Sequence, residues 1–554
     1  MSKPKLEPFR STLDMHILKA KFYHLMKAGR NQLREEYARS SMCREANRPL
    51  GWLLILIFLT LFSSGCGFGQ QAALNEDFRL LVENRQFNGG VLIAEKGRVV
   101  YEKSFGYADF SDHRLNTPDV QFPIASVSKL LTATGILQLA LAGKLHVDDP
   151  VIDYLPTFPY REIKLRNLLS HTSGLPPYNT YFDPLWHASP ERVFTNADFL
   201  SVISTSHIPL LYTPGDKENY DNINYIVLAL ILEKVSGESY PDYIEKHILR
   251  PAGMHDTKFI PLPLQYNKLH SKTFAYPHIY EHFYSDTPVR ANTIPYIRQY
   301  WHSYAFSGFG DYVSTMRDLL KLDAAFRRGL LLNKSMQELA YTPIVPRLEP
   351  KKTDVFGLGW EIEPDSALGH VVYHSGAATG LSCVLLRNLT RDQTVIVFDN
   401  THSNAHEIAS RALKVLNGQA VTAPRKSTAR LYVQTLLKDG PDAAHQLLPT
   451  LHKEAGTSEL SEDEMNSMGY ELMGSSNYYH LPDDIHLDAA IDVLHTNTVL
   501  FPQSWNVWDS YGEALRKNNH IPKSLDAYRR SLMLNPDSES AKRAIAEMQA
   551  TSKP

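Results

Sequence analysis

Cysteine is scarce in this sequence: the chain of 554 residues has only three, Cys43, Cys66 and Cys383. Three cysteines without metal-ligand spacing exclude a disulfide framework and give no sign of a structural metal site. An excess of charge is also lacking, because 57 lysine and arginine residues face 60 aspartate and glutamate residues, for a net charge of −3. Nothing in this balance indicates a nucleic-acid partner. We expect no metal and no other cofactor.

Long apolar runs are lacking as well. The clearest one, Leu50–Phe62, is shorter than the roughly 20 residues that a membrane span needs. It fits the apolar part of a secretory signal, with Arg44 and Arg48 as its positive flank. The alternative is a short uncleaved anchor. In both cases we expect the rest of the chain to lie outside the cytoplasm.

The residues after this run, Ser63-Ser64-Gly65-Cys66, resemble a bacterial lipobox, in which the cysteine is lipidated and becomes the mature N-terminus. This resemblance predicts a leader over residues 1–66 and a periplasmic lipoprotein anchored to the membrane at Cys66. Ser63 departs from the pattern, which usually has leucine three residues before the cysteine. The positive region is too long when counted from the first residue, so residues 1–41 are interpreted as a wrongly assigned extension and Met42 as the better start.

The motif that carries chemistry is Ser126-Val127-Ser128-Lys129, just before the apolar stretch Leu130–Ala142. That stretch is apolar almost all round, which predicts a buried central helix with Ser126 near its N-terminus. A serine hydroxyl is a weak nucleophile until a neighbour takes its proton. Lys129 lies three residues later on the same helix face, and burial can lower its pKa enough for that task. The alternative is an ordinary helix start with a serine cap.

Two further motifs lie at the ends of predicted elements. Tyr220-x-Asn222 precedes a predicted helix over Ile223–Val235, where Asn222 could also simply cap the helix and Tyr220 could also simply be packed. His374-Ser375-Gly376 ends a predicted strand, and its alternative is a plain strand end with a glycine turn. Between these motifs, Gly308–Ser314 is a turn that leads into another predicted helix.

Two histidine-containing segments are weaker candidates. His171 follows a predicted helix, and a structural histidine at a helix end is the favoured interpretation. The segment His278-Ile279-Tyr280-Glu281-His282 matches the H-x-x-E-H pattern of inverted zinc peptidases. Pro277 precedes it and no amphipathic helix carries it, so we reject a zinc site there.

Strand-like segments stand at both ends of the region that holds these motifs. Gly90–Ala94 and Val99–Phe105 flank a short turn and predict a hairpin. His370–Tyr373, Leu381–Arg387 and Thr394–Asp399 predict an antiparallel meander.

The C-terminal part, residues 431–554, is predicted to be mostly helical and to follow a linker over residues 419–430. Its last segment resembles a tetratricopeptide repeat of about 34 residues. The residues that fit this spacing are Trp508, Gly512, Leu515, Tyr528 and Pro536, with Pro502 one period before Pro536. So few repeats cannot make a long solenoid, and we expect a small cap packed on the main domain that offers a surface for a protein partner.

Taken in order, the serine, tyrosine and histidine motifs and the Gly308–Ser314 turn resemble the serine β-lactamase and penicillin-recognising superfamily, specifically its class C-like branch. The tyrosine motif lies about 90 residues after Ser126, and the histidine motif about 150 further on. The resemblance covers about residues 75–418. It implies an α+β fold, with an antiparallel sheet flanked by helices and a mostly helical subdomain, followed here by the C-terminal all-α region.

The resemblance also implies roles for individual residues. Ser126 is the nucleophile, while Lys129 and Tyr220 share the general-base and general-acid work. Asn222 holds Lys129 and a substrate amide. The backbone N–H groups of Ser126 and Ala377 form the oxyanion hole.

The last motif departs from the pattern of the β-lactamases and DD-peptidases. His374 and Ser375 stand where those enzymes usually keep lysine and threonine, and Gly376 follows as usual. All three are expected to support the bound substrate. A histidine is common here in the peptidase and esterase relatives, so the departure puts β-lactam hydrolysis in doubt.

The sequence therefore predicts an extracytoplasmic serine hydrolase that acts through an acyl-enzyme on an ester or on peptides containing D-amino acids. One alternative is a β-lactamase or D-alanyl-D-alanine carboxypeptidase. Another is a non-catalytic binding protein that uses the C-terminal repeats, although intact Ser126, Lys129 and Tyr220 argue against it. No G-x-S-x-G elbow is present, which argues against an α/β-hydrolase. The expected partners are a small-molecule or peptide substrate and, through the lipid anchor, the membrane.

Overall fold

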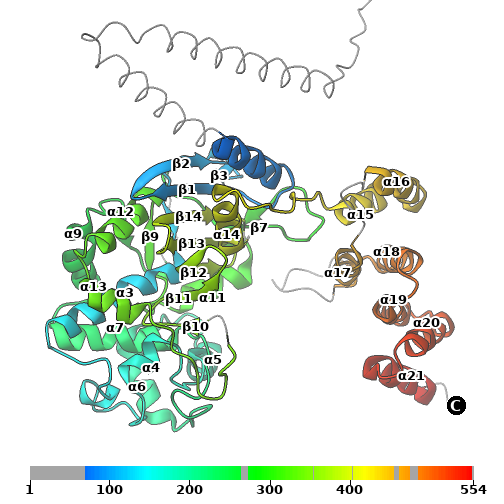
Figure 1. Cartoon of the computed structure of the whole chain (residues 1–554). Helices are drawn as coiled ribbons and strands as arrows, with labels where there is room; N and C mark the ends of the chain where they lie inside the picture. The colour runs from blue at the N-terminus through cyan, green and yellow to red at the C-terminus, as the bar shows by residue number, and fades with distance from the viewer. Residues whose placement is uncertain are drawn as a thin grey trace, which may run out of the picture. The chain divides into compact units, whose positions relative to one another are not determined.

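The structure is a computed structural model of the chain (Figure 1). It describes residues 69–263, 272–352, 355–401, 404–454, 461–474 and 485–551. The sheets and helices below belong to one compact unit, Gln70–Pro554. Cys66 and the predicted leader lie outside the described residues. None of the helices within the described ranges is long and apolar enough to cross a membrane.

A seven-stranded antiparallel sheet forms the centre of the main domain, in the order β10-β11-β12-β13-β14-β1-β2. The strands are β1 Gly89–Glu95, β2 Arg98–Ser104, β10 Val355–Phe356, β11 Glu361–Ser366, β12 Gly369–Ala378, β13 Leu381–Asn388 and β14 Gln393–Asp399. The predicted hairpin is β1 and β2, and the predicted meander is β12 to β14. Both predictions are confirmed.

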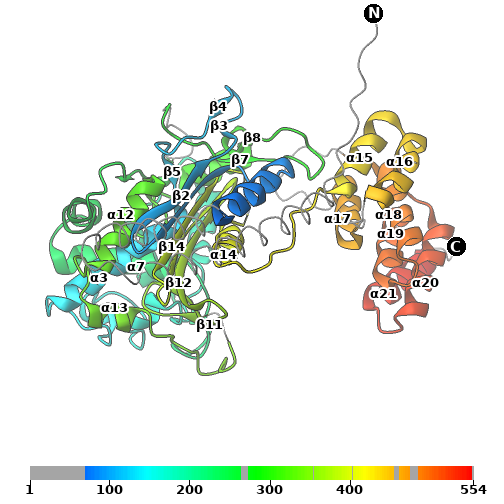
Figure 2. The ribbon, with the colours of Figure 1, turned by 45° about the horizontal axis from the view of Figure 1, so that its top comes forward.

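The central strands β13, β14 and β1 are buried along almost their whole length, which explains why they are apolar runs rather than alternating sequences. Val91 and Val397 point to one face of the sheet, which the helix ending at residue 83 and α14 (Ala405–Leu416) cover (Figure 2). Leu92 and Ile396 point to the other face, where the helices of the main core pack. The sheet is therefore covered by helices on both faces.

Helix α3 (Lys129–Leu141) belongs to this second face and is the buried central helix that the sequence predicts. It packs against α7 (Ile223–Ser236), which is apolar and buried in the same way. A Cβ atom at Gly135 would lie 2.5 Å from the side chain of Leu232, so the missing side chain allows the two helices to approach closely.

A mostly helical subdomain lies between α3 and β10 in the sequence, which completes the predicted α+β architecture. Its α-helices are α4 Leu165–Leu169, α5 Tyr178–Ala188, α6 Asn196–Ser206, α7, α8 Tyr240–Ile244, α9 Arg250–Ala252, α11 Pro295–Ser303, α12 Met316–Arg327 and α13 Lys334–Ala340. Three small sheets accompany them. Two are strand pairs, β3 Tyr107–Asp109 with β4 Arg114–Leu115 and β7 His278–Ile279 with β8 Val289–Arg290. The third has three strands, with β9 Tyr312–Ser314 between β5 Phe122–Pro123 and β6 Lys258–Phe259. The H-x-x-E-H segment thus begins on strand β7 and not on a helix.

The C-terminal region is helical, and α15 begins at Thr428, so the last three residues of the predicted linker are helical. The helices are α15 Thr428–Asp439, α16 Pro441–Glu454, α17 Glu462–Leu472, α18 Leu487–Leu500, α19 Trp505–Lys517, α20 Ile521–Leu534 and α21 Glu539–Thr551. Helices α19 and α20 form an antiparallel pair in which a Cβ at Gly512 would lie 3.0 Å from the ring of Tyr528. Ser524 is buried there and donates its hydroxyl to the Gly512 carbonyl at 2.7 Å.

Candidate active site

Ser126 lies in a single turn of 3₁₀-helix, Ala125–Ser128, between strand β5 and helix α3. Ala125 has φ of +40°, which is uncommon for a residue with a side chain and marks a strained turn. The Ile124 N–H donates to the Tyr312 carbonyl at 3.0 Å and holds the start of the turn to β9. The side chain of Ser126 is partly exposed, so the turn presents its hydroxyl to solvent.

Lys129 is completely buried, and its Nζ contacts three acceptors. These are Ser126 Oγ at 2.9 Å, Asn222 Oδ1 at 2.8 Å and the Phe309 carbonyl at 3.4 Å. An ammonium donates to all three. A neutral amine has two N–H groups, so it donates to Asn222 and Phe309 and leaves its lone pair for the Ser126 hydroxyl proton.

Burial lowers the pKa of Lys129 to about 7, although the carboxylates of Asp221, Glu361 and Asp311 act in the opposite direction. An unperturbed lysine has a pKa of about 10.4 and is almost fully protonated at neutral pH. At a pKa of about 7, roughly half of the molecules carry a neutral Lys129 at neutral pH. The site therefore provides a base beside Ser126.

Tyr220 is the third group around the serine hydroxyl. Its ring centroid lies 4.8 Å from Lys129 Nζ, and its hydroxyl is near enough to Ser126 for that side chain to affect its pKa. Partial burial of the phenol and the nearby charges of Glu361 and Asp221 raise its pKa above the ordinary value. The whole residue is 43 % exposed, so it borders an open face of the site. Tyr220 is thus a protonated phenol at neutral pH.

Asn222 immediately precedes α7, but its side chain makes no cap hydrogen bond to the helix. Asp221 instead accepts the Ile223 N–H at 2.8 Å. The Asn222 amide oxygen is therefore available to Lys129, and helix capping does not explain the residue.

Strand β12 lies against the serine turn, with Gly376 at the point of contact. A Cβ atom at Gly376 would lie 2.5 Å from the Ile124 carbonyl and 3.1 Å from the Ser126 nitrogen, so no side chain fits there. Strand β11 pairs with β12 only as far as Tyr373, so this pairing stops before Ser375.

The direction of the amides along this edge of β12 follows from Ser375. Its N–H and its hydroxyl both donate to Glu361 Oε1 at 2.9 Å, on the side of β12 away from β13. Backbone N–H groups two residues apart on a strand point the same way. The N–H of Ala377 therefore points off the same edge, beside the Ser126 turn.

His374 is fully buried on β12, and burial together with nearby Lys129 lowers its pKa to about 3. Its Nδ1 lies 2.7 Å from the Ser375 carbonyl, an acceptor, so the ring proton is on Nδ1. His171 is also buried, and burial lowers its pKa well below the ordinary value. Its Nδ1 accepts the Asp221 N–H at 3.3 Å, so its proton is on Nε2. Within the described residues, neither Nε2 atom has a hydrogen-bond partner.

The structure thus brings together all the predicted residues of the site except Cys66, which lies outside the described residues. Sequence reasoning missed Glu361, the Phe309 carbonyl and the proximity of His171 to Tyr220, whose ring centroids lie 4.3 Å apart. For His171 the position at a helix end favoured a structural role over that of a base.

Known proteins are similar to this chain over the main domain. The family model described as Beta-lactamase matches residues 74–419. Penicillin-binding protein 4* of Bacillus subtilis (strain 168) is 32 % identical over 352 residues, which are 63 % of this chain and 76 % of that protein. The family match ends before the C-terminal helices.

Solved structures are also similar to this chain. The penicillin-binding protein from Bacillus halodurans is similar with a TM-score of 0.51 and 27 % identity, over 61 % of this chain and 98 % of that chain. The octameric penicillin-binding protein homologue from Pyrococcus abyssi is similar with a TM-score of 0.53 and 25 % identity, over 65 % and 79 % of the two chains.

Proposed function

Because the chain belongs to the β-lactamase family of serine hydrolases, we propose that it hydrolyses esters or peptides containing D-amino acids through an acyl-enzyme at Ser126. The observation that carries this proposal is the contact of 2.9 Å between Lys129 Nζ and Ser126 Oγ, with a lysine pKa of about 7. A base with a pKa near the working pH removes a proton most effectively.

In the first half-reaction, neutral Lys129 takes the proton of Ser126 while Oγ attacks the substrate carbonyl carbon. The carbonyl oxygen becomes an oxyanion that accepts hydrogen bonds from the N–H groups of Ser126 and Ala377. The intermediate then collapses, and the leaving alkoxide or amine takes a proton from the Tyr220 hydroxyl. The Lys129 ammonium returns a proton to Tyr220, and the acyl group remains on Ser126.

In the second half-reaction, water attacks the acyl-enzyme ester. Lys129 and Tyr220 accept the proton of the water and return it to Ser126 Oγ as the acid product leaves. Asn222 keeps Lys129 oriented in both halves through the contact of 2.8 Å. The side-chain nitrogen of Asn222 can donate a hydrogen bond to the carbonyl of a substrate amide.

His374 supports the choice of substrate class. In the relatives that keep lysine here, a fixed charge helps to hold a substrate carboxylate. The Nδ1–H of His374 is already donated to the Ser375 carbonyl, and the neutral ring offers only an acceptor at Nε2. We therefore assign the chain to the peptidase and esterase relatives within the class C-like branch, ahead of the β-lactamases and D-alanyl-D-alanine carboxypeptidases.

The remaining parts of the chain complete the proposal: a leader over residues 1–66, the hydrolase domain over about 75–418, a linker from 419, and a tetratricopeptide-like region to 554 that offers a surface to a protein partner. Lipidation at Cys66 would anchor the enzyme to a membrane outside the cytoplasm. Membrane partitioning that Cys66→Ser abolishes supports this anchor, and an unmodified mature N-terminus upstream of Leu50 refutes it.

The substrate class is tested with purified protein against p-nitrophenyl esters, D-amino-acid anilides and a chromogenic cephalosporin. We expect turnover of an ester or an anilide to exceed that of the cephalosporin, and Ser126→Ala to lose it. Equal turnover by Ser126→Ala would contradict the proposal.

A further inference from the structure

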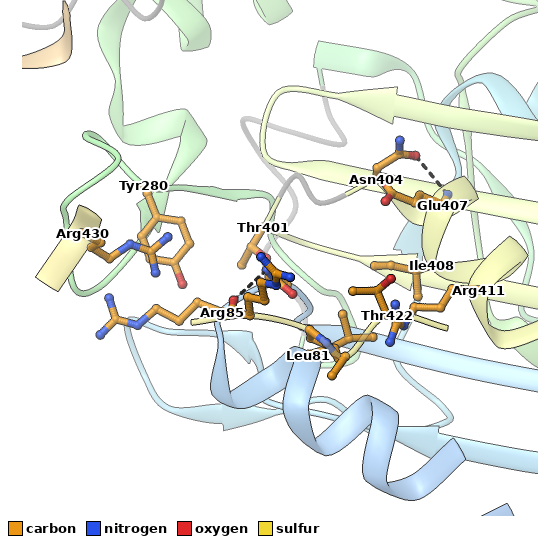
Figure 3. A pocket seen from close by; sticks show the side chains of 14 residues that line it. Leu81, Arg85, Tyr280, Thr401, Asn404, Glu407, Ile408, Arg411, Thr422 and Arg430 are labelled. Carbon is orange, nitrogen blue, oxygen red and sulfur yellow. Dashed lines mark hydrogen bonds between the residues drawn. The ribbon is translucent and has the colours of Figure 1, made fainter. Parts of the chain in front are cut away.

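A cavity lies away from Ser126, between the helix ending at residue 83, helix α14 and the start of α15 (Figure 3). Its volume is about 570 Å³, within the range of about 300–1,000 Å³ that is typical of small-molecule sites. None of the catalytic residues lines it. Four arginines do, against a single acidic residue, Glu407. The arginines are Arg85, Arg411, Arg425 and Arg430.

Two of these arginines are neutralised by carboxylates of the chain. Arg411 donates from Nε and Nη2 to both oxygens of Asp77, and Arg85 Nη2 lies 2.7 Å from Asp286 Oδ1. These two guanidinium groups are therefore held in place.

The other two arginines have no such partner. Arg430 donates its Nε to the Phe283 carbonyl at 3.0 Å. Among the residues that the structure describes, no carboxylate lies within ion-pair distance of the guanidinium of Arg430 or Arg425. Burial and then the positive charge of Arg85 lower the pKa of Arg430, and the carboxylates of Glu464 and Asp286 offset part of this effect. Figure 3 shows the side chains of Arg430 and Arg85 beside Tyr280.

The remaining wall is partly apolar, with Leu81, Ile408 and Pro424 among the lining residues. We propose that this cavity binds a small amphiphilic anion, with its phosphate or carboxylate head between Arg430, Arg85 and Arg425 and its apolar body against Leu81, Ile408 and Pro424. An arginine fork matches the geometry of either head group, and the anion would relieve the repulsion between Arg85 and Arg430. Because Arg85 precedes the sheet and Arg430 begins the C-terminal helices, the bound anion would join these two parts of the chain.

The test is isothermal titration of the full chain with decyl phosphate, decanoate, decyltrimethylammonium and inorganic phosphate, each below its micelle concentration. We expect one decyl phosphate or decanoate to bind per chain, inorganic phosphate to bind more weakly, and the cation not to bind. Whichever of decyl phosphate and decanoate binds more tightly identifies the head group as a phosphate or a carboxylate. Arg430→Gln should weaken anion binding by about tenfold or more, because it removes a charge-assisted contact. The matched control is Arg529→Gln, an exposed arginine on α20 that already pairs with Asp526.

Three results would overturn the proposal. One is equal binding of the anionic and cationic amphiphiles, and another is inorganic phosphate binding as tightly as decyl phosphate. The third is an equal effect of Arg430→Gln and Arg529→Gln when circular dichroism shows both variants folded.

Discussion

His171 and His374 hold their ring protons on opposite nitrogens, although both rings are buried beside Tyr220. His171 presents a donor at Nε2 and His374 an acceptor at Nε2. The two rings thus form a neutral, polar wall of the candidate active site. Neither ring provides a positive charge there.

The first prediction concerns this proton arrangement. In ¹⁵N-histidine spectra, with resonances assigned from His171→Gln and His374→Gln, His374 should be protonated at Nδ1 and His171 at Nε2. Neither ring should gain a second proton between about pH 5 and about pH 8, because both pKa values are lowered. An imidazolium at either position in this range would refute the assignment.

The same histidines should make stability depend on pH. An unfolded histidine binds a proton with a pKa of about 6.5, whereas these folded rings do not. The unfolded state therefore binds more protons below that pH, and the free energy of unfolding should fall as pH decreases from about 6.5. Urea unfolding of wild type and His374→Gln at several pH values measures this contribution.

The second prediction concerns substrate choice. His374→Lys should raise kcat/KM for a cephalosporin relative to a short-chain ester, because an ammonium donates a charge-assisted hydrogen bond to a carboxylate, whereas the neutral ring of His374 has no free donor for it. His374→Gln is the neutral control and should not produce this change. Hydrolysis of the cephalosporin by the wild type near the diffusional ceiling of about 10⁸ M⁻¹s⁻¹ would show that the argument from His374 is wrong.

The third prediction concerns Lys129. Since the neutral amine is the active form, kcat/KM should rise with pH through a midpoint at about 7 and level off above it. A pH–rate profile with an ester substrate measures the midpoint.

Asn222→Asp tests whether that midpoint belongs to Lys129. A carboxylate placed on Nζ favours the ammonium, so the lysine pKa and the midpoint should both move to higher pH. Asn222→Ala removes the contact without adding charge and serves as the control. A midpoint that stays unchanged in Asn222→Asp would assign the titration to another group.

The fourth prediction concerns the contact between β12 and the serine turn. Gly376→Ala places a Cβ 2.5 Å from the Ile124 carbonyl and should push the strand away from Ser126. Loss of an oxyanion contact costs about 10²–10³ in kcat, so we expect a loss of that size with little change in the circular dichroism spectrum. Gly69→Ala, where a Cβ meets nothing within 4 Å, is the control. Full activity of Gly376→Ala would show that catalysis does not need the close contact between β12 and the serine turn.

The sequence predicts the parts of the site that local pattern encodes. Lys129 follows Ser126 by three residues, so helix geometry alone brings them together, and Tyr220-x-Asn222 lies at the start of a strongly apolar helix. These are properties of neighbouring residues, which a linear pattern can record.

Glu361 illustrates what the sequence could not predict. Glu361 and Glu363 flank Ile362, and no local pattern distinguishes Glu361 from Glu363. Only the pairing of β11 with β12 places Glu361 against Ser375, and only tertiary packing places its charge near Lys129. The same holds for the Phe309 carbonyl, whose role depends on the fold of a loop about 180 residues from Lys129.

The central claim is that Ser126 forms the acyl-enzyme with Lys129 as its base, and active-site labelling tests it most directly. Wild type, Ser126→Ala and Lys129→Ala would be incubated with a fluorophosphonate probe, and the adduct would be mapped by mass spectrometry. We predict one adduct on Ser126 in the wild type, none in Ser126→Ala, and strongly slowed labelling in Lys129→Ala, because the base is lost with the side chain. An adduct on another serine, or equal labelling of wild type and Ser126→Ala, would contradict the account.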